Sequence, residues 1–250
     1  MDPMGYLSYE RADEQNDRMA LVGMLQEGRI PIEHLPANMG LFLDSKALAR
    51  ILFMNHIYGL IVDIPGIVMD LGTRWGQNAA LFSSFRGLYE PFNRHRRVVA
   101  FDTFAGFPSV AEEDGNSDLM EPGNLETPEG YAAFLRKILG LNEALNPISH
   151  IKKSSVVEGD CLATVPQYLM DNPETIVALA YFDFDIYQPT KSVLEQISSR
   201  LVRGSVLAFD ELNDPDSPGE TLAVMETVGL RNLRLRRLPF VSRTAYAVVD

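Results

Sequence analysis

Acidic residues follow two apolar runs in the second half of the chain, in positions that suit a metal ion. Asp183 and Asp185 come directly after residues 176–182, and Asp210 comes after residues 205–209. Both runs read as strands buried on both faces of a parallel sheet. Consecutive parallel strands joined by one helix often lie side by side, about 4.8 Å apart. We therefore expect Asp183 and Asp210 to project from the same edge of a sheet.

Carboxylates that converge on one point repel one another unless a cation or shared protons neutralise them. Oxygen ligands favour a hard ion such as Mg²⁺, which keeps several exchangeable waters. In an extended chain Asp183 and Asp185 point to the same side. Asp183 and Asp210 are therefore candidate metal ligands, with structural capping as the alternative. Asp185 is a candidate general base, or it supports the turn.

A second chemical signal lies in residues 67–76, which read IVMDLGTRWG. An apolar run ends in Asp70, a turn with Gly72 and Gly76 follows, and helical spacing begins after it. In an open parallel sheet this first turn lies at the ligand-binding edge. A dinucleotide fingerprint needs a glycine where this chain has Arg74. The turn suits S-adenosylmethionine (SAM), a cationic ligand without phosphates, better than NAD. The alternative is an ordinary turn of any α/β protein.

Two further acids end expected strands. Asp102 follows residues 98–101, where a carboxylate can accept hydrogen bonds from both hydroxyls of a ribose. Asp160 follows the strand expected over residues 154–158 and can accept a hydrogen bond from an adenine amino group. Each acid has a structural alternative, because Asp102 can cap the turn after it and Asp160 can cap the following helix.

Periodicity and turn residues predict an α/β fold with helices ahead of the sheet. Strands are expected over residues 67–69, 98–101, 154–158, 176–182, 205–209, 233–238 and 245–249, the last two forming a hairpin. Helices are expected over residues 13–26, 45–58, 77–89, 127–139, 161–170 and 189–201. Residues 109–126 carry acidic but no basic side chains and should be exposed and mobile, as a lid or as a disordered loop.

Composition limits the possible partners. The chain has 250 residues and a formal net charge of −12, which argues against a nucleic-acid partner. The one local basic cluster, Arg94-His95-Arg96-Arg97, is interpreted as a solvated helix end or loop. Cys161 is the only cysteine, so no disulfide closes within the chain, and its apolar neighbour indicates a buried structural thiol. No signal peptide or membrane span is evident, so we expect a cytoplasmic protein.

The motifs MDLGTRWGQNA, AFDTFAGFP, VVEGD, YFDFDIYQPTK and LAFDEL, in this order, resemble the macrocin O-methyltransferase (TylF/MycF/NovP-like) family, which methylates sugar hydroxyls on glycosylated natural products. The similarity covers roughly residue 51 to the C-terminus. It implies a class I SAM-dependent methyltransferase fold, Rossmann-like, with a seven-stranded, mostly parallel sheet. It also implies a helical extension over residues 1–60, a SAM-binding domain over residues 61–250, and dependence on a divalent metal.

The resemblance also assigns roles to residues of this chain. The expected metal ligands are Asp183, Asp210 and Glu211. The residues expected to bind SAM are Asp70, Gly72, Thr73, Gly76, Asp102, Asp160 and Asp183. The family usually has two aspartates where this chain has Asp210-Glu211, and a glycine where it has Phe184. The N-terminal region matches weakly, and the identity of the acceptor does not carry over.

These observations predict a SAM- and Mg²⁺-dependent O-methyltransferase that acts on a sugar hydroxyl of a small-molecule glycoside. Asp183 or Asp185 would take the proton of the reacting hydroxyl. Relatives are commonly oligomeric, so a homo-oligomer is expected. The alternatives are a catechol-type metal-dependent methyltransferase with a planar acceptor and a non-catalytic SAM-binding protein. An NAD-dependent dehydrogenase is disfavoured by Arg74.

Overall fold

The computed structural model describes residues 11–250. By their internal contacts these residues belong to two compact units, which divide after Leu52. The first unit is helical, with α1 (Ala12–Gln26), the short α2 (Leu35–Asn38) and the beginning of α3 (Ser45–Gly59). The helices predicted over residues 13–26 and 45–58 are confirmed. Within the described residues, no helix is both long enough and apolar enough to cross a bilayer.

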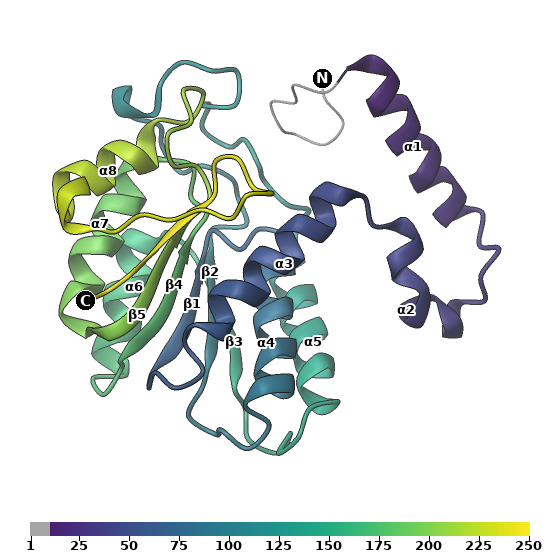
Figure 1. Cartoon of the computed structure of the whole chain (residues 1–250), viewed down its shortest axis with the longest axis horizontal. Helices are drawn as coiled ribbons and strands as arrows, with labels where there is room; N and C mark the ends of the chain where they lie inside the picture. Colours follow the sequence, from purple (N-terminus) through teal and green to yellow (C-terminus); the bar gives the residue numbers. More distant parts are fainter. Residues whose placement is uncertain (1–10) are drawn as a thin grey trace. The chain divides into compact units, whose positions relative to one another are not determined.

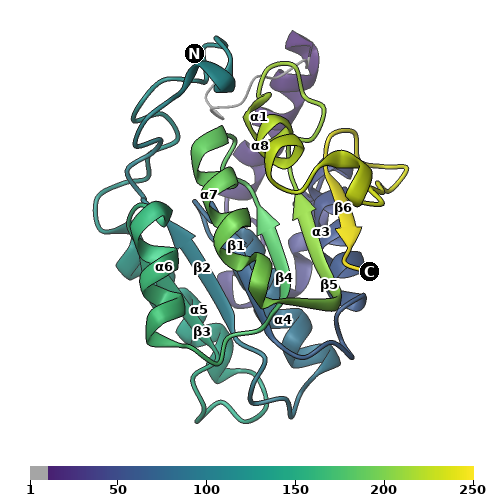
Figure 2. The same ribbon diagram turned by 90° about the vertical axis from the view of Figure 1, so that its left-hand side faces the viewer.

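The second unit is built on one sheet, in the strand order β3-β2-β1-β4-β5-β6. Its strands are β1 (Ile67–Leu71), β2 (Val98–Asp102), β3 (Ser154–Glu158), β4 (Val177–Phe182), β5 (Leu201–Phe209) and β6 (Ala245–Val248). All neighbours are parallel except β5 and β6, as the arrows in Figure 2 show. The strand order reverses between β1 and β4, which is where ligands bind in open α/β sheets.

Helices cover both faces of this sheet (Figure 1). One face carries α4 (Gln77–Tyr89), α5 (Tyr131–Ala144) and residues 53–59 of α3, and the other carries α6 (Cys161–Asp171), α7 (Tyr187–Ile197) and α8 (Gly219–Thr227). Side chains alternate between the faces along each strand. Val68 and Ala100 enter the first core, whereas Met69 and Phe101 enter the second. Both cores hold the carboxyl ends of the strands in place.

The predicted number of strands needs correction, because within residues 11–250 the sheet has six strands rather than seven. The expected strand over residues 233–238 makes only an isolated bridge, between Arg236 and Tyr246. Leu233 and Leu238 at the two ends of this segment pack against the cores, but the arginines between them are exposed: Arg234, Arg236 and Arg237. The antiparallel end of the sheet is confirmed by β6 alone.

The bounds of two predicted helices differ from expectation at both ends, and one helix was not predicted. Helix α5 begins at Tyr131, because Gly130 before it has φ +79°, and it continues through Gly140 to Ala144. Its residue Glu143 is buried, so packing beyond Gly140 outweighs the poor helix propensity of glycine. Helix α7 begins at Tyr187 and ends at Ile197, earlier than predicted at both ends. Helix α8 was not predicted at all.

The basic cluster at residues 94–97 is not uniformly solvated, which corrects the interpretation from the sequence. Arg94 and His95 are exposed, but the Arg96 side chain is buried. Arg96 Nε donates to Glu90 Oε2 at 2.9 Å, and its Nη atoms donate to three backbone carbonyls in residues 61–66. A planar guanidinium with five donors can satisfy all of these acceptors at once. Arg96 therefore ties the approach to β1 to the end of α4.

The acidic segment, residues 109–126, is exposed as predicted at all its acids except Asp114. Asp114 is buried, and its two carboxylate oxygens accept hydrogen bonds from the Ala111 amide at 2.7 Å and the Tyr187 amide at 2.5 Å. Met120 from the same segment packs with Phe107 and Ile186 in a small separate core. The segment is therefore attached to the first turn of α7. Whether it acts as a lid stays a hypothesis.

Candidate active site

The turn after β1 is tightly packed against the turn after β4. Gly72 has φ +88°, and a Cβ atom added there would lie 2.0 Å from the Asp183 carbonyl oxygen. The Gly72 amide donates to Phe101 O at 2.9 Å, and the Thr73 hydroxyl donates to the buried Asp70 carboxylate. A side chain at position 72 would be strained and would push the two turns apart. The glycine predicted from the sequence is therefore required by the geometry.

Asp102, at the end of β2, binds the same turn from the other side. Its Oδ2 accepts a hydrogen bond from the Arg74 amide at 2.7 Å, and its Oδ1 accepts one from the Phe104 amide at 2.6 Å. Burial raises the pKa of Asp102, and the two amides and the Arg74 charge act against this rise. Each carboxylate oxygen has two lone pairs, so both atoms keep capacity for a further donor.

Asp160 and Cys161 lie one strand further along the sheet edge. Asp160 is the N-cap of α6, and its Oδ1 accepts a hydrogen bond from the Leu162 amide at 2.9 Å. The structural alternative for Asp160 is thus present, and a contact with adenine stays a prediction. Cys161 is buried as expected, and burial together with the Asp160 charge raises the pKa of its thiol to about 12.

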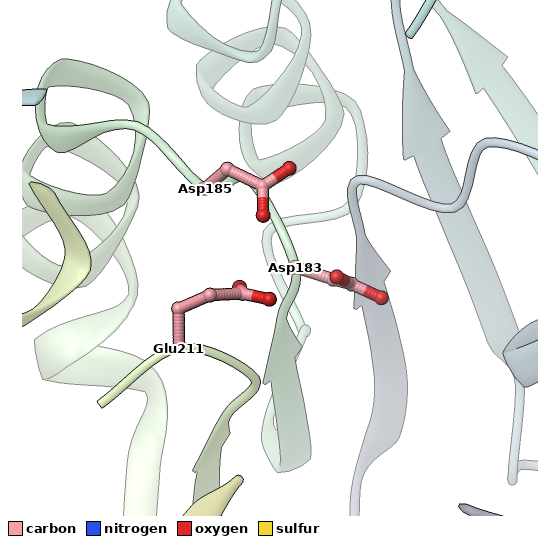
Figure 3. Close-up of side chains that lie close together, drawn as sticks. All are labelled: Asp183, Asp185 and Glu211. Carbon is pink, nitrogen blue, oxygen red and sulfur yellow. The ribbon is translucent and has the colours of Figure 1, made fainter. Parts of the chain in front are cut away.

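Three carboxylates lie close together at the ends of β4 and β5 (Figure 3). Asp183, Asp185 and Glu211 each offer one oxygen, and these oxygens all lie within 4.8 Å of one another. Asp185 has φ +62°, a left-handed conformation that aspartate tolerates at tight turns. This turn brings its carboxylate back toward Glu211. The structure therefore joins Asp185, expected as a base, to two of the expected metal ligands.

Asp210 lies beside this group and has partners of its own. The register pairs Phe182 with Phe209, so Asp183 and Asp210 both follow directly after paired residues, as predicted. The buried Asp210 Oδ1 accepts hydrogen bonds from the Tyr181 hydroxyl and, at 3.3 Å, from Thr244 Oγ1. Asp183 accepts a hydrogen bond of 3.3 Å from Asn78 Nδ2.

Glu220 is a fifth acid at this site, fully buried, and it was not predicted from the sequence. It belongs to α8, and its carboxylate accepts hydrogen bonds from the Phe184 and Glu211 amides, each at 3.2 Å. Glu220 thereby holds together the two turns that carry the acids. The available signal was Pro218, which favours the first turn of a helix, followed by an acid that suits a helix N-terminus.

The electrostatics of this cluster favour a cation. Burial raises the pKa of Asp185 to about 6, and it raises the pKa values of Glu211 and Glu220 well above their usual range, with neighbouring carboxylates adding to each rise. Arg243 is a nearby positive side chain, 3.0 Å from Glu211 Oε1 and 3.1 Å from Asp214 Oδ2, and the Arg74 charge also acts on Asp185. Among residues 11–250, no group donates a hydrogen bond to the buried Glu211 Oε2.

Comparisons with known proteins agree with this geometry. No protein-family model matches the chain, and no curated protein sequence matches it. Among solved structures, CalS11, a calicheamicin methyltransferase, is 40% identical with a TM-score of 0.94, and the match covers 96% of this chain and 94% of that one. An apo structure of CalS11, there named a TDP-rhamnose 3'-O-methyltransferase, matches with 38% identity, a TM-score of 0.86 and 96% coverage of both chains.

The O-methyltransferase NovP shares the fold at 16% identity, with a TM-score of 0.61 and coverage of 81% of this chain and 80% of that one. The fold of class I SAM-dependent methyltransferases is therefore confirmed for this chain. The match to CalS11 extends over nearly the whole of both chains. The chain is an O-methyltransferase and belongs to the TylF/NovP-like family of sugar O-methyltransferases.

Proposed function

We propose that this protein transfers the methyl group of SAM to a sugar hydroxyl during the biosynthesis of a natural product, with the help of a divalent metal ion such as Mg²⁺. One observation carries the proposal. The glycine turn after β1 is in backbone contact with the turn after β4 that begins the carboxylate cluster, through Gly72 and Asp183. A sulfonium held at the first turn would thus lie next to carboxylates that could hold a metal ion and accept the proton of a hydroxyl.

The cofactor would lie along the carboxyl edge of β1, β2 and β3. Asp70, Gly72, Thr73 and Gly76 would hold its methionine part, with Asp183 beside the sulfonium. Asp102 would accept hydrogen bonds from the ribose hydroxyls, which its remaining lone pairs allow. Asp160 would accept a hydrogen bond from the adenine amino group in addition to its capping role. Asp70, Asp102 and Asp160 lie at the ends of the neighbouring strands β1, β2 and β3, in the order in which the parts of the cofactor would follow one another, and this supports the assignment.

The carboxylate cluster fits a hard divalent cation. The proposed ligands are Asp183, Asp210 and Glu211, all of them oxygen donors of the kind that Mg²⁺ prefers. The buried Glu211 oxygen without a donor among the described residues, and the raised pKa of that side chain, support the fit. A bound ion would offset the clustered negative charge and lower the pKa of an acceptor hydroxyl. Asp185 competes with Asp210 for the third ligand position, because its oxygen lies closer to the others.

The side chains of this protein would supply the rest of the chemistry. Asp185 would accept the proton of the reacting hydroxyl, with Asp183 as the alternative base. Burial raises the pKa of Asp185 to about 6, so it would be ionised at neutral pH and still be a better base than an exposed aspartate. Much of the remaining acceleration would come from alignment of the hydroxyl oxygen with the methyl group and the departing sulfur.

An acceptor assay with matched variants tests the proposal. Sugar nucleotides, simple glycosides and catechols would be supplied with SAM, and methyl transfer would be detected by mass spectrometry. We expect transfer to a sugar and none to a catechol. Asp185→Asn should lower the rate by about a hundredfold or more, since a positioned base contributes that much, and should leave SAM affinity unchanged. Transfer to catechols alone, or wild-type rates for Asp185→Asn, would contradict the proposal.

A further inference from the structure

An arginine-rich segment adjoins the acidic site. Residues 231–243, which run from within the short helix η5 (Leu230–Asn232) to the approach of β6, contain five arginines in a chain whose net charge is −12. Four of them are exposed: Arg231, Arg234, Arg236 and Arg237. Within the part of the chain that the structure describes, none of these four has an acidic side chain at ion-pair distance. The segment therefore presents positive charge that no described acid neutralises.

The segment lies at the same end of the sheet as the carboxylate cluster (Figure 2). At its C-terminal end, Arg243 contacts Glu211. Arg236 exchanges two backbone hydrogen bonds of 2.8 Å with Tyr246, which is paired in turn with Ala208 of β5. Neighbouring strands are about 4.8 Å apart, so the Arg236 backbone lies about 10 Å from β5. A sugar ring and its first phosphate can span that distance.

We propose that this segment binds the diphosphate of a nucleoside diphosphate sugar, so that the acceptor is a sugar nucleotide rather than a finished glycoside. The inference rests on the proposed function. A phosphate would be repelled by the carboxylate cluster, whereas this segment presents exposed cations and leads directly into Arg243, which contacts the cluster. Arginine binds phosphate through two parallel hydrogen bonds, which gives both strength and orientation.

Two further observations agree with this assignment. CalS11, the relative that is 38% identical in its apo structure, is named as an enzyme that acts on TDP-rhamnose, which carries such a diphosphate. The same segment also exposes the ring of Phe240, a surface on which a nucleobase can stack. The strongly negative net charge of the whole chain disfavours a long polyanion such as RNA as the ligand.

Binding of thymidine diphosphate to the full chain, measured by calorimetry in the presence of S-adenosylhomocysteine, tests the inference. We expect thymidine diphosphate to bind, thymidine to bind much more weakly, and the difference to shrink as added salt screens the charges. The double variant Arg236→Gln with Arg237→Gln should weaken binding of thymidine diphosphate by about tenfold or more, because charge-assisted hydrogen bonds are lost. SAM affinity should not change.

Arg203→Gln is the matched control, because Arg203 is also exposed but lies near the start of β5, away from the carboxyl edge. It should bind thymidine diphosphate like the wild type. In kinetics, the double variant should raise KM for a TDP-sugar with little change in kcat, since the lost contact is the same in ground and transition states. Transfer to the methyl glycoside of the same sugar should be equal in both variants.

Several results would overturn the inference. These are equal affinities for thymidine and thymidine diphosphate, equal effects of the double variant and of Arg203→Gln, or arginine-dependent binding of an RNA oligonucleotide without binding of thymidine diphosphate. If a methyl glycoside is methylated and thymidine diphosphate does not bind, the inference is wrong and the proposed function stands. If no sugar is methylated in any form, the proposed function fails, and the assignment of the acceptor fails with it.

Discussion

At the scale of single residues, the site depends on positions where one residue type is required. Gly72 is the sharpest case, because it combines φ +88° with a clash that any Cβ would make against the Asp183 backbone. The sequence motif already indicated a glycine turn for a ligand. The motif did not explain why glycine is needed there. The reason is the close contact between the turns after two neighbouring strands, β1 and β4.

Gly72→Ala should therefore destabilise the fold by about 2 kcal/mol or more and weaken SAM binding at least several-fold. Gly140→Ala is the control, since Gly140 lies inside α5 with nothing within 4 Å of the added atom. It should stabilise the protein by roughly 0.5–1 kcal/mol. Urea unfolding and calorimetric titration with SAM measure both effects. Equal unfolding and equal SAM affinity for Gly72→Ala and the wild type would rule out this role of the turn.

A partly buried histidine gives a second prediction at this scale. His56 Nε2 lies 2.8 Å from the Tyr246 hydroxyl, and burial lowers the pKa of His56 below its usual value of 6.5. Between that lowered pKa and 6.5 the unfolded chain binds a proton that the folded chain does not, so the free energy of unfolding should fall as pH drops through this window.

His56→Gln should remove this part of the pH dependence, because glutamine does not titrate. His95→Gln, at an exposed position, should leave the dependence as in the wild type. Urea unfolding at several pH values between 5 and 7 measures the difference, which should be about 1 kcal/mol or less for a shift of this kind. A His56→Gln variant that loses as much stability in acid as the wild type would contradict the assignment.

At the scale of elements, the acidic segment differs most from its expected behaviour. Charge composition alone predicted a mobile stretch, yet Asp114 accepts hydrogen bonds from the first turn of α7 and Met120 is buried against Ile186. The sequence could not indicate which of several similar acids turns inward, because that choice depends on an amide 73 residues away. The segment is thereby anchored next to the Asp183–Asp185 turn.

Asp114→Ala should release this anchor and cost about 1–3 kcal/mol, because buried amides lose their acceptors. Hydrogen exchange in residues 109–126 should become faster. Glu113→Ala changes the exposed neighbouring acid and should leave exchange in that region nearly unaltered. Hydrogen exchange followed by mass spectrometry, with and without SAM, measures both variants. Equal exchange in the two variants would show that Asp114 is not the anchor, and protection by SAM would favour the lid hypothesis.

At the scale of the whole molecule, the sequence predicted the sheet better than the elements packed around it. Strands β2 and β3 were found within one residue, since short apolar runs ending in Asp102 or Gly159 leave few alternatives. Helix α8 and its Glu220 were missed because their role appears only when α8 packs over the ends of β4 and β5. The burial of Arg96 was not predicted, because a run of basic residues does not indicate which of them will find backbone carbonyl partners in the interior.

The sequence also predicted part of the candidate site. Acids at strand ends converge because parallel strands end at one edge, which is a property of the topology. The position of Asp185 depends on a left-handed turn and was not predictable from alternation alone. The homo-oligomer stays a prediction, to which the exposed apolar side chains of Met24, Ile32 and Leu41 in the helical unit are relevant.

The most direct test of the central claim is the methyl-transfer rate of the chelator-treated full chain as Mg²⁺ is restored. The account predicts that chelation removes transfer to the sugar acceptor and that Mg²⁺ restores it in the wild type. Asp183→Asn and Asp210→Asn should bind SAM normally and yet need at least about a tenfold higher Mg²⁺ concentration, or fail to recover. Full activity of the wild type in excess chelator would contradict the claim that the carboxylate cluster holds a catalytic metal ion.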